Sequence, residues 1–221
     1  MHVFVTGGTG YIGTRVIASL LARGHTVRAL VRPGSETRLP ARAQAVVGDA
    51  LVEASVAQAL ASSETLVHLV GTPHPGPAKA KEFEAVDLAS IRASVGAAKR
   101  AKIPHLVYVS VARPAPTMQA YIAVRMKGEA AIAEAGLTAT ILRPWYVLGP
   151  GHWWPIALVP FYVVAEIVPA TRESARRLGL VSIAQMVRAL VQAVEAPPPE
   201  GERRIVDVPA IRRAQPEEPP Q

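Results

Sequence analysis

The sequence predicts an α/β protein built on a doubly wound parallel sheet, and three observations carry this prediction. Short apolar runs alternate with longer amphipathic segments from the N-terminus to about residue 142. The short runs are apolar throughout, which is typical of parallel strands covered by helices on both faces. A glycine-rich turn at 7–13 joins the first run to the first amphipathic segment. With 221 residues, the chain has the size of one domain with a substantial core.

The first unit is a buried strand over 2–6, a tight turn and a helix that begins near Gly10. Three glycines in this turn are spaced three apart. The first permits the turn, the second lets the backbone approach a pyrophosphate, and the third removes a side chain where helix and strand pack. The first N–H groups of the helix then point at the phosphates. A glycine-rich turn without a ligand is the alternative. The predicted dinucleotide-binding residues here are Gly7, Thr9, Gly10, Tyr11, Ile12 and Gly13.

The alternation of strands and helices continues through the next 120 residues. Helices are indicated by apolar residues on one stripe, and glycine or proline residues mark their ends. The predicted strands cover 25–31, 45–48, 65–71, 105–111 and 138–142, and the helices between them cover 53–62, 79–101 and 118–135. The ligand crevice of such a sheet lies at the carboxyl ends of its strands.

The last third of the chain differs in composition. An aromatic and proline-rich stretch begins at 145, and a helix at 184–195 is flanked by short strands at 178–181 and 205–208. We therefore expect a single domain over 1–212, in which 145–180 forms a substrate or lid region. The polar, proline-rich residues 213–221 are expected to be a disordered tail.

Composition and charge exclude several classes of function. The net charge is +7, but the basic residues are scattered and no recognition module with interleaved aromatics occurs, so we expect no nucleic-acid partner. The chain has no cysteine, which excludes disulfides and thiolate-bound metals, and we expect no metal site, because His152 has no ligand partner nearby. No signal peptide is apparent, so a cytoplasmic location is expected. The oligomeric state is not indicated.

Four segments carry a resemblance to a known family. They are TGGTGYIG at 6–13, GD at 48–49, VYVS at 107–110 and ILRPWYVLGPG at 141–151. Together they resemble the atypical or extended short-chain dehydrogenases/reductases, in the NmrA-like, NAD(P)H-binding group. The resemblance extends from residue 2 to about 208. It implies a Rossmann-type fold, with a nucleotide at the strand ends and a substrate region formed by the last third.

The choice of cofactor depends on the end of the second strand. NAD-preferring proteins carry a carboxylate there, whereas this chain has Arg32, whose guanidinium fork matches a 2′-phosphate. We therefore expect NADP, with NAD as the alternative and a solvated Arg32 as the other interpretation. The resemblance implies that Asp49 bonds the adenine amino group, although Asp49 could instead cap the following helix. Gly71 and Thr72 are expected beside the adenine ribose and the pyrophosphate.

The resemblance also implies catalysis by a tyrosine, with a lysine four residues later and a serine on the same substrate oxygen. Here Tyr121 opens a helix, Ser110 ends the preceding strand, and Arg125 replaces the lysine. Arg125 lies one turn from Tyr121, where its charge would favour the phenolate form, but its planar head differs from an ammonium. The pair is an acid/base pair or an anchor for the nicotinamide ribose, or Tyr121 simply packs. We expect Glu129 to pair with Arg125, and Arg143 to be an ion-pair partner or a substrate contact.

These residues predict an NADP-dependent oxidoreductase that acts on a carbonyl or quinone-like small molecule. The replacement of lysine by Arg125 favours an alternative, a non-catalytic NADP(H) sensor or accessory subunit. A nucleotide-sugar epimerase ranks lower because the chain is short for the usual substrate domain. The run 153–168 has one charge in sixteen residues and is too short to span a membrane. It is interpreted as a lid, a dimer face or a peripheral membrane contact.

Overall fold

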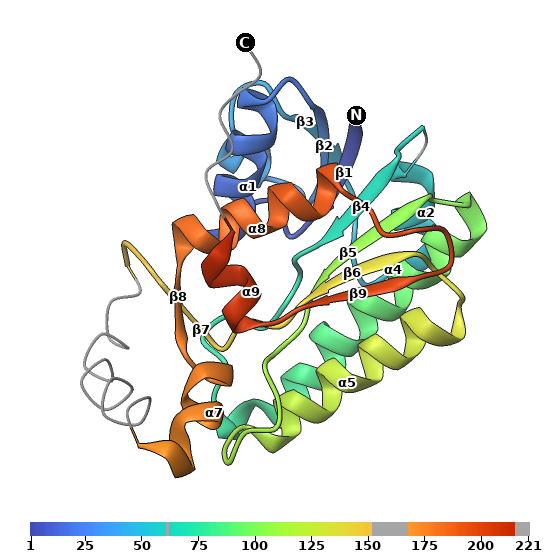
Figure 1. The fold of residues 1–221 in the computed structure, drawn as a ribbon. Helices are drawn as coiled ribbons and strands as arrows, with labels where there is room; N and C mark the ends of the chain where they lie inside the picture. The colour runs from blue at the N-terminus through green and yellow to red at the C-terminus, as the bar shows by residue number, and fades with distance from the viewer. Residues whose placement is uncertain (61, 152–167, 215–221) are drawn as a thin grey trace.

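The computed structural model describes residues 1–60, 62–151 and 168–214 (Figure 1). Its centre is a parallel sheet of seven strands in the order β3-β2-β1-β4-β5-β6-β9, which confirms the predicted doubly wound architecture. Each adjacent pair is parallel. The strands are β1 (His2–Thr6), β2 (Thr26–Val31), β3 (Gln44–Val47), β4 (Thr65–His68), β5 (His105–Val109), β6 (Ala139–Leu142) and β9 (Arg203–Val206).

Helices cover both faces of the sheet, as the apolar strands require (Figure 1). Strand β1 shows why: Val3 and Val5 enter one core cluster, and Phe4 between them enters the other. Successive side chains of a strand point to opposite faces, so both faces need an apolar cover. Helices α1 (Tyr11–Ala22) and α8 (Ile183–Glu195) pack on the first cluster. Helices α2 (Glu53–Ala59), α4 (Ala89–Ala101) and α5 (Gln119–Glu134) pack on the second.

The glycine-rich turn lies where the strand order reverses. Strand β1 sits between β2 and β4, so the chain leaves β1 beside the carboxyl end of β4. The Leu69 N–H donates to the Thr6 carbonyl across this junction at 3.0 Å. Ligands of doubly wound sheets bind at such a switch point, outside the carboxyl ends of the strands.

The helical stretch predicted at 79–101 is divided in the structure. It consists of η2 (Pro77–Lys79), α3 (Ala80–Glu82), the π-helical segment η3 (Phe83–Leu88) and α4. The sequence contains no sign of the wider turns, because the same apolar stripe suits both helix types. Segments of π-helix occur frequently at functional sites, and η3 packs against α5.

The C-terminal third adds a second, two-stranded sheet. Strand β7 (Tyr146–Leu148) pairs in parallel with β8 (Leu180–Ser182), and α7 (Pro169–Arg177) precedes β8. The strand predicted over 205–208 ends at Val206. It stops there because Asp207 caps helix α9 (Val208–Arg213), its carboxylate accepting from the Ala210 N–H at 2.9 Å.

Residues 213 and 214, predicted to begin a disordered tail, are packed in the structure. Helix α9 includes Arg213, and Ala214 is buried against the core, so the packed chain continues to residue 214. Residues 215–221, His152 and the run 153–167 lie outside the described residues. Within the described part of the chain, no helix is long and apolar enough to cross a membrane.

Candidate dinucleotide and substrate site

The backbone of the glycine-rich turn requires glycine at two of its positions. Gly7 has a φ of +76°, and a Cβ there would lie 2.6 Å from the Leu69 carbonyl carbon. A Cβ on Gly13 would collide with the Gly7 carbonyl oxygen and lie 2.8 Å from the Gly8 backbone. The turn closes through a hydrogen bond from Gly10 N–H to the Gly7 carbonyl at 3.1 Å. Helix α1 is therefore drawn tightly onto the end of β1.

The start of α1 suits a pyrophosphate. Its N-cap is Gly10, with extended backbone and no side-chain cap bond, and the first turn holds no acidic residue. The positive end of the helix dipole here favours an anion. Tyr11 and Ile12, at the first two helical positions, are half-buried. The Tyr11 ring lies under the Arg15 guanidinium, 4.3 Å from its central carbon, and its hydroxyl contacts Gly149.

Two arginines lie on the β2 side of this turn. Arg32 directly follows β2 and is exposed. Arg38, at the end of η1 (Glu36–Arg38), donates from Nη2 to the Thr9 carbonyl at 3.1 Å. The sequence reasoning missed Arg38. Its only signal was a second arginine six residues after Arg32, and the bond to the glycine-rich turn depends on the path of the loop between them.

Asp49 lies beyond β3, is exposed, and does not cap the following helix. The N-cap of α2 is Val52, which makes no side-chain bond. Asp49 Oδ1 instead accepts from the Leu51 N–H at 2.9 Å, and the Asp49 N–H donates to Ser55 Oγ at 2.9 Å. The capping alternative is therefore wrong.

Thr72 and Gly71 lie over a buried ion pair. Asp87 Oδ2 accepts from the Thr72 amide at 2.9 Å and from its hydroxyl at 2.6 Å. Asp87 Oδ1 and Arg125 Nη2 are 2.5 Å apart, and both side chains are buried. A Cβ on Gly71 would collide with Arg125 Nη2. Both the amide and the hydroxyl of Thr72 are thus engaged by Asp87, which fixes the chain at 71–72 against the buried ion pair.

Arg125 is held between two elements and stacks on Tyr121. Its Nη1 donates to the Val109 carbonyl at 2.9 Å, and its central carbon lies 5.0 Å from the Tyr121 ring centroid. Burial alone would lower the pKa of Arg125, but Tyr121, Tyr108 and Asp87 outweigh it and hold that pKa above its ordinary value. The predicted pairing of Glu129 with Arg125 is wrong, since the partner comes from another helix.

Tyr121, in the first turn of α5, is half-buried against η3. The Phe83 ring meets it edge-on, with centroids 5.0 Å apart. Its hydroxyl makes no hydrogen bond with any residue of the described ranges. The phenol is therefore fixed by its ring and available at its oxygen.

Ser110 lies in a separate cluster. Its Oγ donates to Glu129 Oε1 at 2.6 Å, and Glu129 also accepts from Arg113 and Arg143. Glu129 follows Tyr121 by eight residues on α5, which is about 12 Å along the helix axis. The structure therefore places Ser110 with Glu129 and makes Arg143 an ion-pair partner of that carboxylate.

A buried polar network connects the ends of β1 and β4 to α4. His68 Nδ1 lies 3.0 Å from Thr6 Oγ1 and 2.9 Å from Ser94 Oγ. Burial, with a smaller contribution from Arg125, lowers the pKa of His68 to about 3. The ring is therefore a neutral part of the core, which leaves the positive charge at this edge to the arginines.

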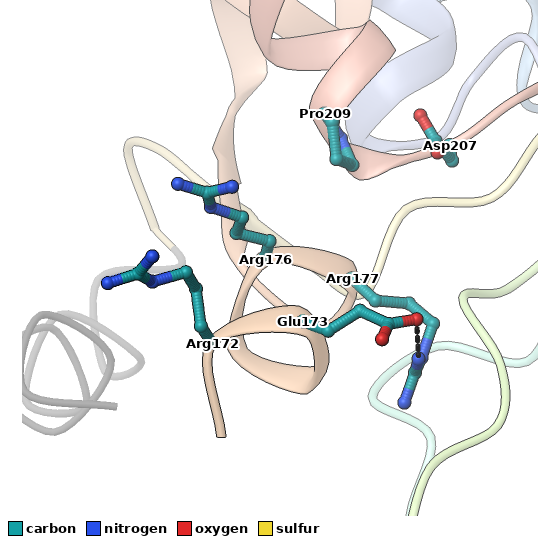
Figure 2. A pocket seen from close by; sticks show the side chains of 6 residues that line it. All are labelled: Arg172, Glu173, Arg176, Arg177, Asp207 and Pro209. Carbon is teal, nitrogen blue, oxygen red and sulfur yellow. Dashed lines mark ion pairs between the residues drawn. The ribbon is translucent and has the colours of Figure 1, made fainter. Parts of the chain in front are cut away.

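A hollow of about 400 Å³ lies between α7 and the start of α9 (Figure 2). Two of its arginines, Arg172 and Arg176, extend toward the same side, whereas Arg177 turns away and pairs with Glu173 at 3.7 Å. The lining residues are Arg172, Glu173, Arg176, Arg177, Asp207 and Pro209. This hollow adjoins the predicted substrate or lid region.

Comparisons with known proteins agree with this geometry. A family model described as NAD(P)H-binding matches residues 7–149. A ceramide reductase of Caulobacter vibrioides is 25% identical over 200 residues, covering 88% of this chain and 61% of the relative. A 4-hydroxy-2-methyl-3-oxo-4-farnesyl-3,4-dihydroquinoline-1-oxide ketoreductase of Stigmatella aurantiaca is 28% identical over 171 residues, covering 67% and 51%. The chain thus spans between half and two thirds of the length of these relatives.

Solved structures show the same fold. The UDP-glucuronic acid 4-epimerase of Bacillus cereus, solved in complex with NAD, superposes with a TM-score of 0.68 at 18% identity. The match covers 94% of this chain and 77% of the epimerase. At this identity the likeness supports the Rossmann-type architecture.

Proposed function

Because the chain belongs to the NAD(P)H-binding family, we propose that it is an NADP-dependent oxidoreductase that reduces a carbonyl or quinone group of an apolar small molecule. One observation carries the proposal. The Arg125 guanidinium lies over the Tyr121 ring and bonds the Val109 carbonyl, which places the pair at the carboxyl end of β5. NAD(P) is the cofactor, and its pyrophosphate fits the uncapped start of α1.

The chemistry needs a hydride and a proton. When bound, the nicotinamide supplies the hydride to the substrate carbon. The Tyr121 hydroxyl donates its proton to the substrate oxygen, and solvent restores it afterwards. The positive charge of Arg125 stabilises the phenolate left by this transfer. A positioned acid contributes about 10²–10⁴-fold in rate.

The preference for NADP rests on Arg32 and Arg38. No carboxylate stands at the end of β2, and Arg38 is bonded to the same turn that receives the pyrophosphate. Two guanidinium groups on this side of the turn suit the 2′-phosphate, which arginine binds through paired N–H donors.

The substrate class rests on the relatives and on composition. Their names describe reductases of a ceramide and of a farnesylated quinoline oxide, both of which carry long apolar groups. In this chain, the run 153–168 has one charge in sixteen residues. We propose that this run meets the apolar part of the substrate and makes a peripheral contact with the membrane that holds it. Co-sedimentation with vesicles tests the contact, and equal recovery with and without vesicles would contradict it.

Turnover with matched tyrosine variants tests the catalytic proposal. NADPH oxidation is followed at fixed cofactor with quinones and ketones that carry isoprenoid or acyl chains. We expect Tyr121→Phe to lower kcat by about 10²-fold or more and to leave NADPH affinity unchanged. Tyr108→Phe is the control, because the Tyr108 hydroxyl is buried against Gly128. Equal rates for wild type and Tyr121→Phe would remove Tyr121 from catalysis.

The non-catalytic alternative has a specific observation in its favour. Arg125 is bonded to Asp87 and to the Val109 carbonyl, and Ser110 is bonded to Glu129, so two of the three predicted catalytic residues have structural partners. Tight NADPH binding without turnover of any substrate in the panel would favour a sensor or accessory subunit. Epimerase activity ranks below both, because the epimerase likeness is one of fold.

A further inference from the structure

Glu129 gathers donors from two neighbouring loops at the carboxyl edge of the sheet. The loop after β5 is joined to the loop after β6 by two backbone bonds. Ser110 N–H donates to the Leu142 carbonyl at 2.7 Å, and Ala112 N–H donates to the Pro144 carbonyl at 2.9 Å. These bonds bring Arg113 of one loop and Arg143 of the other to the same carboxylate.

Every acceptor position of Glu129 is in use. Oε1 accepts from Ser110 Oγ at 2.6 Å and from Arg143 Nε at 3.0 Å. Oε2 accepts from Arg143 Nη2 at 2.6 Å and from Arg113 Nη2 at 2.8 Å. Burial alone would raise the pKa of Glu129, but the bonds from Arg143, Ser110 and Arg113 outweigh it and hold that pKa below its ordinary value. The carboxylate is therefore ionised and saturated.

The two guanidinium groups are not saturated. Each arginine has five N–H donors, of which Arg143 gives two to Glu129 and Arg113 gives one. The side chain of Glu129 is 9% exposed, whereas those of Arg143 and Arg113 are 23% and 28% exposed. Two cations against one anion leave the cluster with a net positive charge.

The other ion pair of the site behaves differently. Asp87 and Arg125 balance each other, and their side chains are 0% and 6% exposed. The Ser110 proton is directed at Glu129, so this hydroxyl does not donate to a substrate oxygen while Glu129 is ionised. Arg125 also keeps an N–H group without a partner among the described residues, but its side chain is only 6% exposed, whereas Arg113 and Arg143 present their remaining donors from partly exposed side chains.

We propose that Arg113 and Arg143 form a subsite for an anionic oxygen group of the substrate, and that Glu129 is the residue that positions them. The cluster follows β5 and β6, at the edge where ligands of this architecture bind. Paired guanidinium donors recognise carboxylate, sulfonate or phosphate oxygens in their plane. This inference rests on the proposed function. It makes the substrate amphiphilic, with an anionic head, a reducible group that reaches Tyr121 further along α5, and an apolar remainder.

Binding of two matched quinones tests the subsite without turnover. Anthraquinone-2-sulfonate and uncharged 2-(hydroxymethyl)anthraquinone are measured by equilibrium dialysis against the NADP⁺-loaded protein. The wild type binds the sulfonate more tightly. Arg113→Gln and Arg143→Gln each weaken sulfonate binding by about ten- to a hundredfold, the range of a charge-assisted hydrogen bond, and leave the uncharged quinone unchanged. Arg92→Gln, which removes an exposed arginine from α4, is the charge-matched control.

Glu129→Gln separates positioning from charge. This change adds one positive charge to the cluster, so charge alone would tighten sulfonate binding, whereas loss of positioning weakens it. Circular dichroism checks that each variant is folded. If Arg143→Gln is unfolded, Arg143→Lys, which keeps the positive charge, is measured instead. Arg143→Lys is also expected to lose sulfonate affinity. Equal affinities of the wild type for both quinones, or arginine variants that match Arg92→Gln, would overturn the subsite. A lack of NADPH oxidation would count against the proposed function alone.

Discussion

Asp87 and Arg125 form a buried ion pair across two helices, 38 residues apart in sequence, with 2.5 Å between Oδ1 and Nη2. Four residues earlier on each helix, Phe83 and Tyr121 pack edge to face. Segment η3 and helix α5 thus meet through two matched contacts, one ionic and one aromatic. Together they fix both the Tyr121 ring and the cation over it.

Removing the Asp87 charge is expected to destabilise the fold strongly. Asp87→Asn leaves the buried Arg125 without its counter-ion, and breaking a buried pair in this way costs about 3–5 kcal/mol. Urea unfolding measures the loss. Glu84→Gln is the matched control, because the Lys127–Glu84 pair is about half exposed and such pairs contribute about 0–1 kcal/mol. Similar losses in the two variants would contradict a structural role for Asp87.

Substitution of two glycines of the turn is expected to have different effects on stability and on NADPH affinity. Gly13→Ala places a Cβ against the Gly7 oxygen and the Gly8 backbone, so we expect a loss of about 1–3 kcal/mol in the free energy of unfolding. In Gly10→Ala the nearest atom is the Gly7 oxygen at 3.2 Å, and Gly10 is exposed, so stability changes less while NADPH affinity falls. Unfolding curves and NADPH titration separate the two, and identical effects would refute the assignment.

The cofactor preference is expected to depend on Arg32 and Arg38. Arg32→Gln and Arg38→Gln each weaken NADPH binding by about tenfold or more, the loss of a charge-assisted bond, and spare NADH. Arg42→Gln is the control, since Arg42 lies in the same loop and donates to the Leu21 carbonyl. Titration of tryptophan fluorescence with NADPH and with NADH gives the ratio of the two dissociation constants. An unchanged ratio in both variants would return the choice between NADP and NAD to an open question.

Acid is expected to destabilise the protein through two buried histidines. Burial, then Arg204, lowers the pKa of His105 to about 4, and burial, then Arg125, lowers that of His68 to about 3. At pH values between these pKa values and 6.5, the two histidines bind protons in the unfolded chain but not in the folded chain. The free energy of unfolding therefore falls as the pH drops, by about 2 kcal/mol per histidine between pH 7 and pH 5.

Urea unfolding at the two pH values checks this prediction. His105→Gln keeps a polar partner for Thr140. It is expected to remove about half of the fall in the free energy of unfolding between pH 7 and pH 5. His74→Asn changes an exposed histidine in a left-handed backbone position that asparagine tolerates, and should leave the loss unchanged. A His105→Gln protein with the pH dependence of the wild type would show that His105 is not responsible.

The limits of sequence reasoning are clear at the ends of the strands. The runs at 65–71 and 105–111 were predicted as strands, but pairing stops at His68 and Val109. Leu69 and Val111, beyond these ends, pack on the first core cluster, and composition does not separate that role from a place in a strand. The π-helical turns of η3 were missed because the apolar stripe suits either helix type. Helix α9 was missed although its signal is local, an Asp207 cap three residues before the Ala210 N–H that it accepts from.

By itself the sequence determined the parallel sheet and the dinucleotide turn, because both follow from local patterns: continuous apolar runs and glycines three apart. It also placed Tyr121 and Arg125 on one helical face, since four residues make about one turn. Only the tertiary structure decided that Arg125 pairs with Asp87, that Ser110 bonds Glu129, and that Arg38 reaches the glycine-rich turn. Long polar side chains reach several elements, and which partner they take depends on how the chain packs around them.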